Sequence, residues 1–391
     1  MTMIDAATVT PSRSVPVSGM LSPPLPDSGV GLLGQVEQIA AGPLAEMAGR
    51  IDQGHYPLEI MASLGRAGGL GAHLDRRGQR FDQAIGAMAE VSRHCGTTGF
   101  LVWAHDVFGL YLEQSGNPAL CGDFLERHAR GDSFGGTALS NPMKALSGIE
   151  SLALRARRVP GGYRVSGTLP WVSHIAAGQY CGALAGVEGA DGSLSHEIMF
   201  VLHCREEVAL RQCPAFSGME GSSTWSITLK DYFVGEDELI ADPARPFIAR
   251  IKAAFILLQT GMAVGVTQGS IDAIREVEPA LGHVNQHLDE RPDALQAELD
   301  ELRQRALTLA KTPFEGGRDF LLEVLDARVQ GSELALRASQ SALLHQGARG
   351  YLMSAASQRR IREAHFVAIV TPAIKHLRWE MARLMREEMP S

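Results

Sequence analysis

Two hydrophobic periodicities divide the chain into three parts. From residue 30 to about 131 apolar residues recur at helical spacing, and the stretch TTGFLVWAHDVFGLYLEQSGN is apolar on nearly all sides, which is typical of a buried helix. From Phe134 to Val234 the pattern changes to period 2, in short runs broken by Gly, Pro, Asp and Ser. Near Pro246 the helical spacing returns and continues almost to the end of the chain.

These patterns predict an α+β fold that is mostly helical. We expect a disordered lead-in (1–29), an N-terminal helical domain (30–131), a central antiparallel β-barrel domain (132–243) and a C-terminal four-helix bundle (244–391). The predicted strands cover residues 151–158, 163–173, 179–187, 197–203 and 224–234. One final helix is predicted over most of residues 357–388.

The β domain centres on a predicted hairpin. Apolar and polar residues alternate in SLALRARR and in YRVSGTL, on either side of a Pro160-Gly161-Gly162 turn. The second strand runs into Trp171 and Ser173, which share one face because they are two residues apart. The indole would stack on a flat cofactor ring while the hydroxyl bonds to the edge of that ring. The alternative is a half-buried strand tryptophan with an ordinary serine neighbour.

Composition excludes several classes of function. The chain has 391 residues, is 45% hydrophobic and carries a net charge of −8 without a basic block, so we expect no nucleic-acid partner. No apolar run approaches the roughly 20 residues needed to cross a bilayer, so no membrane partner is expected. Five scattered cysteines without a CxxC pair predict neither a disulfide framework nor a metal site, and they suit the cytoplasm.

Two common catalytic motifs of other enzyme classes are missing from the sequence. It contains no HExxH or GxxxxGK[ST], so metalloprotease and P-loop functions lack support.

The order of the three parts, with FGGTALSNP and GGYRVSGTLPWVS at the centre, resembles the acyl-CoA dehydrogenase superfamily over roughly residues 30–388. Three further stretches resemble segments of that superfamily in the same order: GMEGSSTWSITLKDYFV, AVGVTQGSID and QGARGY. The resemblance implies a flavin, FAD or FMN, held between the β domain and the bundle. It assigns a set of residues to cofactor binding: Thr137, Ser140, Trp171, Val172, Ser173 and Arg349.

The catalytic base of the superfamily's dehydrogenases is not matched. The position of the usual glutamate holds Thr371, followed by Pro372, and the alternative position on the first bundle helix holds about Phe255. Abstraction of an α-proton needs a titratable group within hydrogen-bond reach, and neither residue provides one. We therefore do not expect acyl-CoA dehydrogenation by the standard mechanism.

A second branch of the superfamily, the two-component monooxygenases such as dibenzothiophene monooxygenase, is a closer match. RHCGTTGFLVWAHDVFG resembles the buried helix of that branch, and SNP and GGYRVSGTLPWVSHI resemble its flavin segments. The likeness assigns hydrogen bonds to activated oxygen to Asn141, Ser173 and His174. His105, Phe255 and Thr371 are assigned to the substrate pocket, although a satisfied core histidine is the alternative for His105.

The adenosine-binding pattern of the dehydrogenases is also incomplete. The stretch GHVNQHLDERP has no suitable aromatic residue and no arginine before Arg291, which favours FMN or a flavin supplied in reduced form by a partner reductase. The alternative to cofactor binding by Arg349 is that its side chain is a solvated charge in a loop.

Three hypotheses follow from the sequence. The first is a reduced-flavin monooxygenase of a small organic substrate, the second an acyl-thioester dehydrogenase with an unconventional base, and the third a catalytically silent binding or scaffolding homologue. The resemblance implies a homotetramer.

Overall fold

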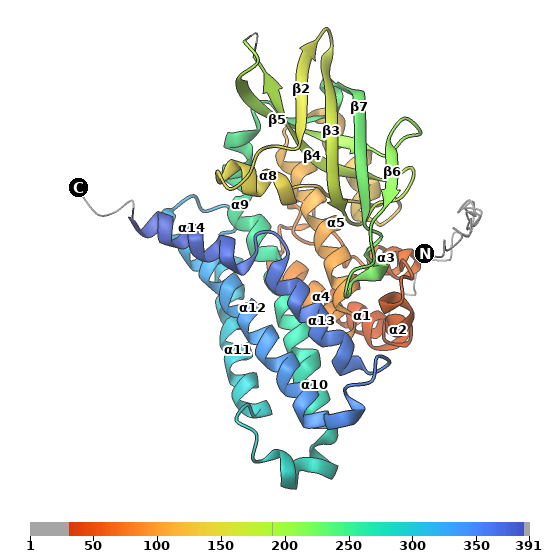
Figure 1. Ribbon diagram of the computed structural model, residues 1–391, viewed down its shortest axis with the longest axis vertical. Helices are drawn as coiled ribbons and strands as arrows, with labels where there is room; N and C mark the ends of the chain where they lie inside the picture. The colour runs from red at the N-terminus through yellow and green to blue at the C-terminus, as the bar shows by residue number, and fades with distance from the viewer. Residues whose placement is uncertain (1–30, 190, 387–391) are drawn as a thin grey trace, which may run out of the picture.

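The computed structural model describes residues 31–189 and 191–386 and has a sheet-containing part above a helical part (Figure 1). The long helix α5 (Gly96–Gln114) runs between the two parts. The order of helices, strands and helices confirms the fold class predicted from the sequence. The predicted lead-in (1–29) lies outside the described residues.

Short helices surround α5 in the N-terminal part. In chain order the elements are α1 (Leu32–Ile39), a π-helical turn (Ala40–Leu44), α2 (Ala45–Asp52), α3 (Leu58–Arg66), α4 (Phe81–His94), α5, α6 (Pro118–Cys121) and α7 (Asp123–Ala129). Every residue of α5 from Gly96 to Leu112 is buried, as its all-round apolar sequence predicts. Because α5 contacts strand β1 and the bundle helix α10, it joins all three parts of the fold.

The strands form one mixed sheet in the order β6-β7-β3-β2-β4-β5-β8, with β1 added beside β4. They are β1 (Gly135–Thr137), β2 (Leu154–Val159), β3 (Gly162–Val172), β4 (Tyr180–Glu188), β5 (Leu194–His203), β6 (Ala209–Gln212), β7 (Trp225–Gly235) and β8 (Leu239–Ala241). The predicted hairpin is the antiparallel pair β2–β3. Most pairings are antiparallel, but β4 is parallel to β1 and β2. Both β2 and β4 run opposite to β3. The neighbouring strands β2 and β4 are therefore parallel to each other.

Two segments differ from the sequence prediction. Residues Ser140–Leu146 form a short helix, α8, inside the period-2 region. The final predicted helix is two helices, α13 (Ala356–Ile369) and α14 (Ile374–Arg386). They separate at Pro372, which has no N–H to donate and disfavours helical geometry at the preceding Thr371.

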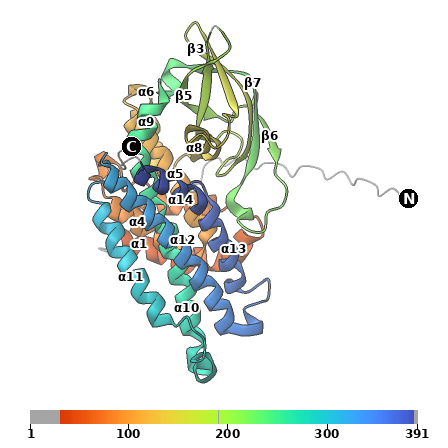
Figure 2. The same ribbon diagram turned by 60° about the vertical axis from the view of Figure 1, so that its left-hand side comes forward.

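The C-terminal helices form the bundle, with α10–α13 side by side in both views (Figures 1 and 2). The elements that precede α13 are α9 (Ala244–Leu258), α10 (Thr260–Asn285), α11 (Pro292–Leu309) and α12 (Arg318–Gln346). By length and composition alone the segment Ala244–Asn285 could cross a membrane, in contrast to the expectation that no apolar run is long enough. However, 83% of its most apolar 18-residue window is buried inside the fold, as expected for a core helix.

Candidate functional site

The end of β3 presents an exposed indole next to a buried aliphatic side chain. Trp171 is 62% exposed and Val172 only 1%, beside an irregularity in the pairing of β3 with β7 between Leu169 and Val172. The exposed ring of Phe216 meets the indole edge-on, with the ring centroids 6.5 Å apart. Val172 packs in the core of the sheet, so only its backbone is available to a ligand.

A row of hydroxyl groups lies directly beyond this strand. Ser173 Oγ lies 2.7 Å from Thr224 Oγ1, which in turn lies 2.8 Å from Ser222 Oγ. Val172 is paired with Trp225 across the sheet, so the run 218–224 is held next to Ser173. The structure therefore brings Ser173, a predicted flavin contact, together with a second segment that resembles the superfamily.

His174 points into the N-terminal helical part instead of toward the exposed face of Trp171. Its backbone is left-handed (φ 61°), and its N–H donates to the carbonyl of Ser222 over 2.9 Å. Nδ1 lies 2.7 Å from the hydroxyl of Tyr56, just before α3, and Nε2 has no hydrogen-bond partner among the described residues. Burial lowers the pKa of His174 well below its ordinary value, so the ring is neutral. In this position it anchors the strand end to the N-terminal part.

The connection from β1 to α8 is attached at both of its ends. The hydroxyls of Tyr111, on buried α5, and Thr137 lie 2.8 Å apart. Ser140 Oγ lies 3.0 Å from Thr371 Oγ1, which belongs to the turn between α13 and α14. The segment that carries two predicted cofactor contacts is thus held between α5 and the bundle.

Asn141 stabilises a loop with its side-chain amide. Its Nδ2 donates to Glu150 Oε1 and to the carbonyl of Ser151, at 2.8 and 2.9 Å, and its Oδ1 accepts from the N–H of Ala153 at 2.8 Å. Both polar atoms of the amide are therefore engaged within the loop that leads to β2.

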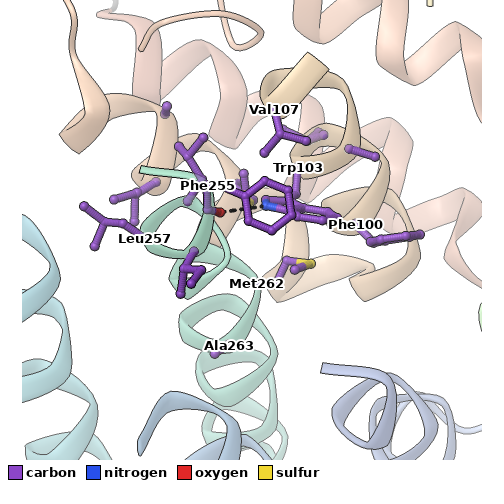
Figure 3. Packing of buried hydrophobic residues seen from close by; sticks show 14 of the residues in the cluster. Phe100, Trp103, Val107, Phe255, Leu257, Met262 and Ala263 are labelled. Carbon is purple, nitrogen blue, oxygen red and sulfur yellow. Dashed lines mark hydrogen bonds between the residues drawn. The ribbon is translucent and has the colours of Figure 1, made fainter. Parts of the chain in front are cut away.

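The two positions expected for a catalytic base have different environments. Thr371 is partly buried, and its carbonyl accepts from Gln259 Nε2 at 2.9 Å. Phe255 is 2% exposed and packs edge-on against Trp103, with centroids 5.2 Å apart (Figure 3). The indole N–H of Trp103 donates to the carbonyl of Phe255 over 3.4 Å. Phe255 is therefore a core residue.

His105 belongs to a buried group of imidazoles that the sequence did not reveal. It stacks on His128 with ring centroids 3.5 Å apart, and each ring donates from Nε2 to the other's backbone carbonyl at 2.8 Å. The ring of His174 lies 5.7 Å away. Burial lowers the pKa of His105 to about 4. His105 thus fits the description of a core histidine, and its Nδ1 lacks a partner within 31–189 and 191–386.

Arg349 lies at the opposite end of the bundle from the other predicted site residues. Gln259, at the start of α10, bonds to Thr371, whereas Asn285, the last residue of α10, bonds to the carbonyl of His345. A helix of 26 residues spans about 39 Å. Within one copy of the chain, Arg349 is therefore too distant to contact a ligand at Trp171.

Several residues near the site had no signal in the sequence. Gln259 and Arg328 are polar residues on apolar helices, and only the packing of those helices shows that both are fully buried beside Thr371. A cavity of about 500 Å³ lies between α8, α9 and α14. Its lining includes the cationic Arg245, Lys252 and Arg383, together with Trp379.

The residues at the end of β3 and the start of α8 fit a flavin. The exposed indole offers a plane for the ring system, and the hydroxyls of Ser173, Ser140 and Thr371 offer donors and acceptors for its polar edge. Within the part of the chain that the structure describes, no group of three or more His, Cys, Asp or Glu side chains is arranged to hold a metal ion.

Comparisons with known proteins agree with this fold. Residues 31–132 match the family model of the acyl-CoA dehydrogenase N-terminal domain. The chain is 24% identical over 371 residues to the human mitochondrial short-chain specific acyl-CoA dehydrogenase, covering 88% of this chain and 87% of that protein.

Solved structures of two enzyme classes have the same fold. Glutaryl-coenzyme A dehydrogenase in complex with glutaryl-CoA gives a TM-score of 0.80 at 19% identity, covering 92% of this chain and 95% of that one. Dibenzothiophene monooxygenase from Paenibacillus sp. A11-2 gives 0.75 at 16% identity, covering 92% and 98%. The protein therefore has the acyl-CoA dehydrogenase fold, and the resemblance to that superfamily is confirmed. Within the superfamily, the chain resembles both dehydrogenases and monooxygenases.

Proposed function

We propose that the protein is a flavin-dependent oxidoreductase that uses reduced flavin and O₂ to oxygenate a small organic substrate. The reduced flavin supplies two electrons, one oxygen atom enters the substrate and the other leaves as water. The chain itself would bind and orient the flavin and the substrate and would exclude bulk water.

The observation that carries this proposal is the chemistry of the two base positions. Thr371 presents a hydroxyl that is bonded to Ser140, and Phe255 is an apolar core residue. The buried carboxylates of the bundle are engaged elsewhere, Glu363 with Arg359 and Glu380 with Lys252. An α-proton would therefore meet no available base at either position, whereas oxygenation by reduced flavin does not require one there.

The proposed roles follow the geometry of the site. Trp171 stacks on the flavin ring. Ser173 forms a hydrogen bond at the reactive edge of the ring, and Thr137 and Ser140 form hydrogen bonds at its polar end. Among solved relatives, the dibenzothiophene monooxygenase has been solved with FMN bound, so either FMN or FAD is proposed as the cofactor. We further propose that a separate reductase supplies the flavin in reduced form.

Rapid mixing tests this function directly. Purified protein loaded with reduced FMN or FAD is mixed with oxygenated buffer, and the absorbance is followed. The proposal expects a transient species that differs from both reduced and oxidised flavin. If no transient forms and an acyl-CoA bleaches bound oxidised FAD, the protein is a dehydrogenase.

Acyl-thioester dehydrogenation is the second candidate because of the cavity between α8, α9 and α14. Arg245, Lys252 and Arg383 in its lining are paired with Glu197 and Glu380, which leaves a net positive charge to meet an anionic tail, and Trp379 suits a ring. Under this candidate an unconventional base would take the α-proton.

A catalytically silent scaffold is the third candidate, and protein that binds no flavin in either oxidation state would favour it.

We also propose a cytoplasmic homotetramer. The five cysteines are all free, which suits a reducing compartment. In an oligomer, Arg349 would reach the flavin of another copy.

A further inference from the structure

Arg328, on α12, is a fully buried guanidinium without a carboxylate partner. It is 0% exposed and has the largest fully buried side chain among the described residues. Its Nε donates to Gln259 Oε1 at 2.9 Å, Nη1 donates to Ser332 Oγ, and Nη2 donates to the carbonyl of Val367 at 2.6 Å. No Asp or Glu of 31–189 or 191–386 forms an ion pair with it. An uncompensated buried charge is costly, so its retention calls for a function.

A chain of hydrogen bonds connects this charge with the candidate flavin segment. Gln259 accepts from Arg328 with Oε1 and donates with Nε2 to the carbonyl of Thr371 at 2.9 Å. The hydroxyl of Thr371 then lies 3.0 Å from that of Ser140. The orientation of the amide is fixed, since a guanidinium only donates and a carbonyl only accepts. The direction of the hydrogen bonds is therefore defined from the cation to the carbonyl of Thr371, whereas either hydroxyl can donate in the bond between Thr371 and Ser140.

The positive charge of Arg328 is only partly offset. Val367 lies in the last turn of α13, whose C-terminal end carries the equivalent of about half a negative charge. Burial lowers the pKa of Arg328 to about 10, so the guanidinium remains charged at neutral pH. The remaining positive potential acts on the partly buried turn at Thr371, through an interior that screens it poorly, and extends to the exposed Ser140 beside that turn.

We propose that Arg328 is a positioning residue that holds Thr371 against Ser140 and makes the flavin site prefer reduced, anionic flavin to oxidised flavin. This inference rests on the proposed function. Two-electron reduction places negative charge on the pyrimidine side of the flavin ring, and a fixed positive charge favours that form. The preference would let the protein capture reduced flavin from a pool in which both forms occur.

The experiment is an anaerobic titration of the full-length protein with FMN and FAD in both oxidation states. The ratio of the two dissociation constants is the readout, because a residue with a merely structural role would weaken both forms alike. We expect wild-type protein to bind the reduced form at least tenfold more tightly. Arg328→Met should reduce that ratio about tenfold, which lowers the two-electron midpoint potential of the bound flavin by about 30 mV.

Two more variants separate charge from packing. Gln259→Glu places a carboxylate on Arg328 without changing the size of the side chain, and it also removes the Nε2 donor to the Thr371 carbonyl, so it should reduce the ratio at least as much as Arg328→Met does in folded protein. Arg328→Lys keeps the charge and should keep the ratio. Arg337→Met, on the same helix but in exposed ion pairs with Glu290 and Glu298, is the matched control and should also keep it.

Two results would overturn the inference alone. One is that the wild-type protein binds oxidised and reduced flavin with equal affinity. The other is that folded Gln259→Glu protein has the same ratio of dissociation constants as the wild type. Absence of flavin binding in either oxidation state would overturn the proposed function as well, so the two failures are distinguishable.

Discussion

Ser140 and Thr371 are 231 positions apart in the chain, yet their hydroxyl oxygens lie 3.0 Å apart. One belongs to the segment with the predicted cofactor contacts, and the other occupies the position at which the sequence resemblance predicts the base of a dehydrogenase. The contact joins the sheet-containing part to the bundle at the point where the chemistry would take place.

This contact should be measurable as a coupling. Ser140→Ala and Thr371→Val each remove one hydroxyl, and the double variant should be more stable than the sum of the single effects predicts, by about 0.5–1 kcal/mol. Urea denaturation of the four proteins gives the coupling free energy. Thr371→Ser is the control that keeps the hydroxyl. Additive effects within about 0.3 kcal/mol would show that the contact does not couple the two parts.

Trp171 should contribute to flavin affinity with little effect on stability. Its indole is mostly exposed, so Trp171→Ala removes few core contacts, whereas loss of stacking should weaken flavin binding by about 1–3 kcal/mol, or roughly 5- to 150-fold. Fluorescence titration measures the affinity. Trp379→Ala, at another partly exposed tryptophan on α14, is the matched control. Equal affinities of Trp171→Ala and wild-type protein would contradict the stacking role.

Phe255 should behave as a core residue. Phe255→Ala should lower the free energy of unfolding by about 3–5 kcal/mol, because Trp103 and its neighbours would face a cavity. Chemical denaturation measures the loss. Phe216→Ala, which truncates an exposed ring, should change stability by less than about 0.5 kcal/mol. If the two variants were equally stable, Phe255 would line an open pocket instead.

The buried imidazoles should make the fold sensitive to acid. Burial lowers the pKa of His105 to about 4 and that of His73 to about 3, so the folded protein keeps these rings neutral. The unfolded chain takes up protons below about pH 6.5, and stability therefore falls as the pH falls. Each ring contributes about 1.4 kcal/mol per pH unit until its folded pKa is reached.

Urea denaturation at a series of pH values between 7.5 and about 4.5 tests this acid sensitivity. Replacing His105 by phenylalanine should flatten the pH profile, whereas His287→Gln, at an exposed position, should leave the profile unchanged. A profile that is the same for the His105 variant and the wild type would show that the ring titrates normally.

The sequence predicted those features that depend on local periodicity. Alternation located the β2–β3 hairpin, and the all-round apolar pattern located the buried helix α5.

Features that depend on distant partners could not be predicted in this way. The sequence predicts for His174 a hydrogen bond to activated oxygen, and in the structure its left-handed backbone turns the ring toward Tyr56. Asn141 was assigned a catalytic role, whereas its amide pairs with a loop that begins six residues later. Arg328 is buried because several helices pack around it, and no sequence pattern along α12 predicts that burial.

The links at Tyr56–His174 and Ser140–Thr371 each join two of the three parts of the fold. Cutting the chain at a domain boundary would leave buried polar groups without partners in both fragments. The three parts are therefore unsuited to independent expression or to exchange between relatives, and we expect such a chimera to fold only when both halves of each link come from the same parent.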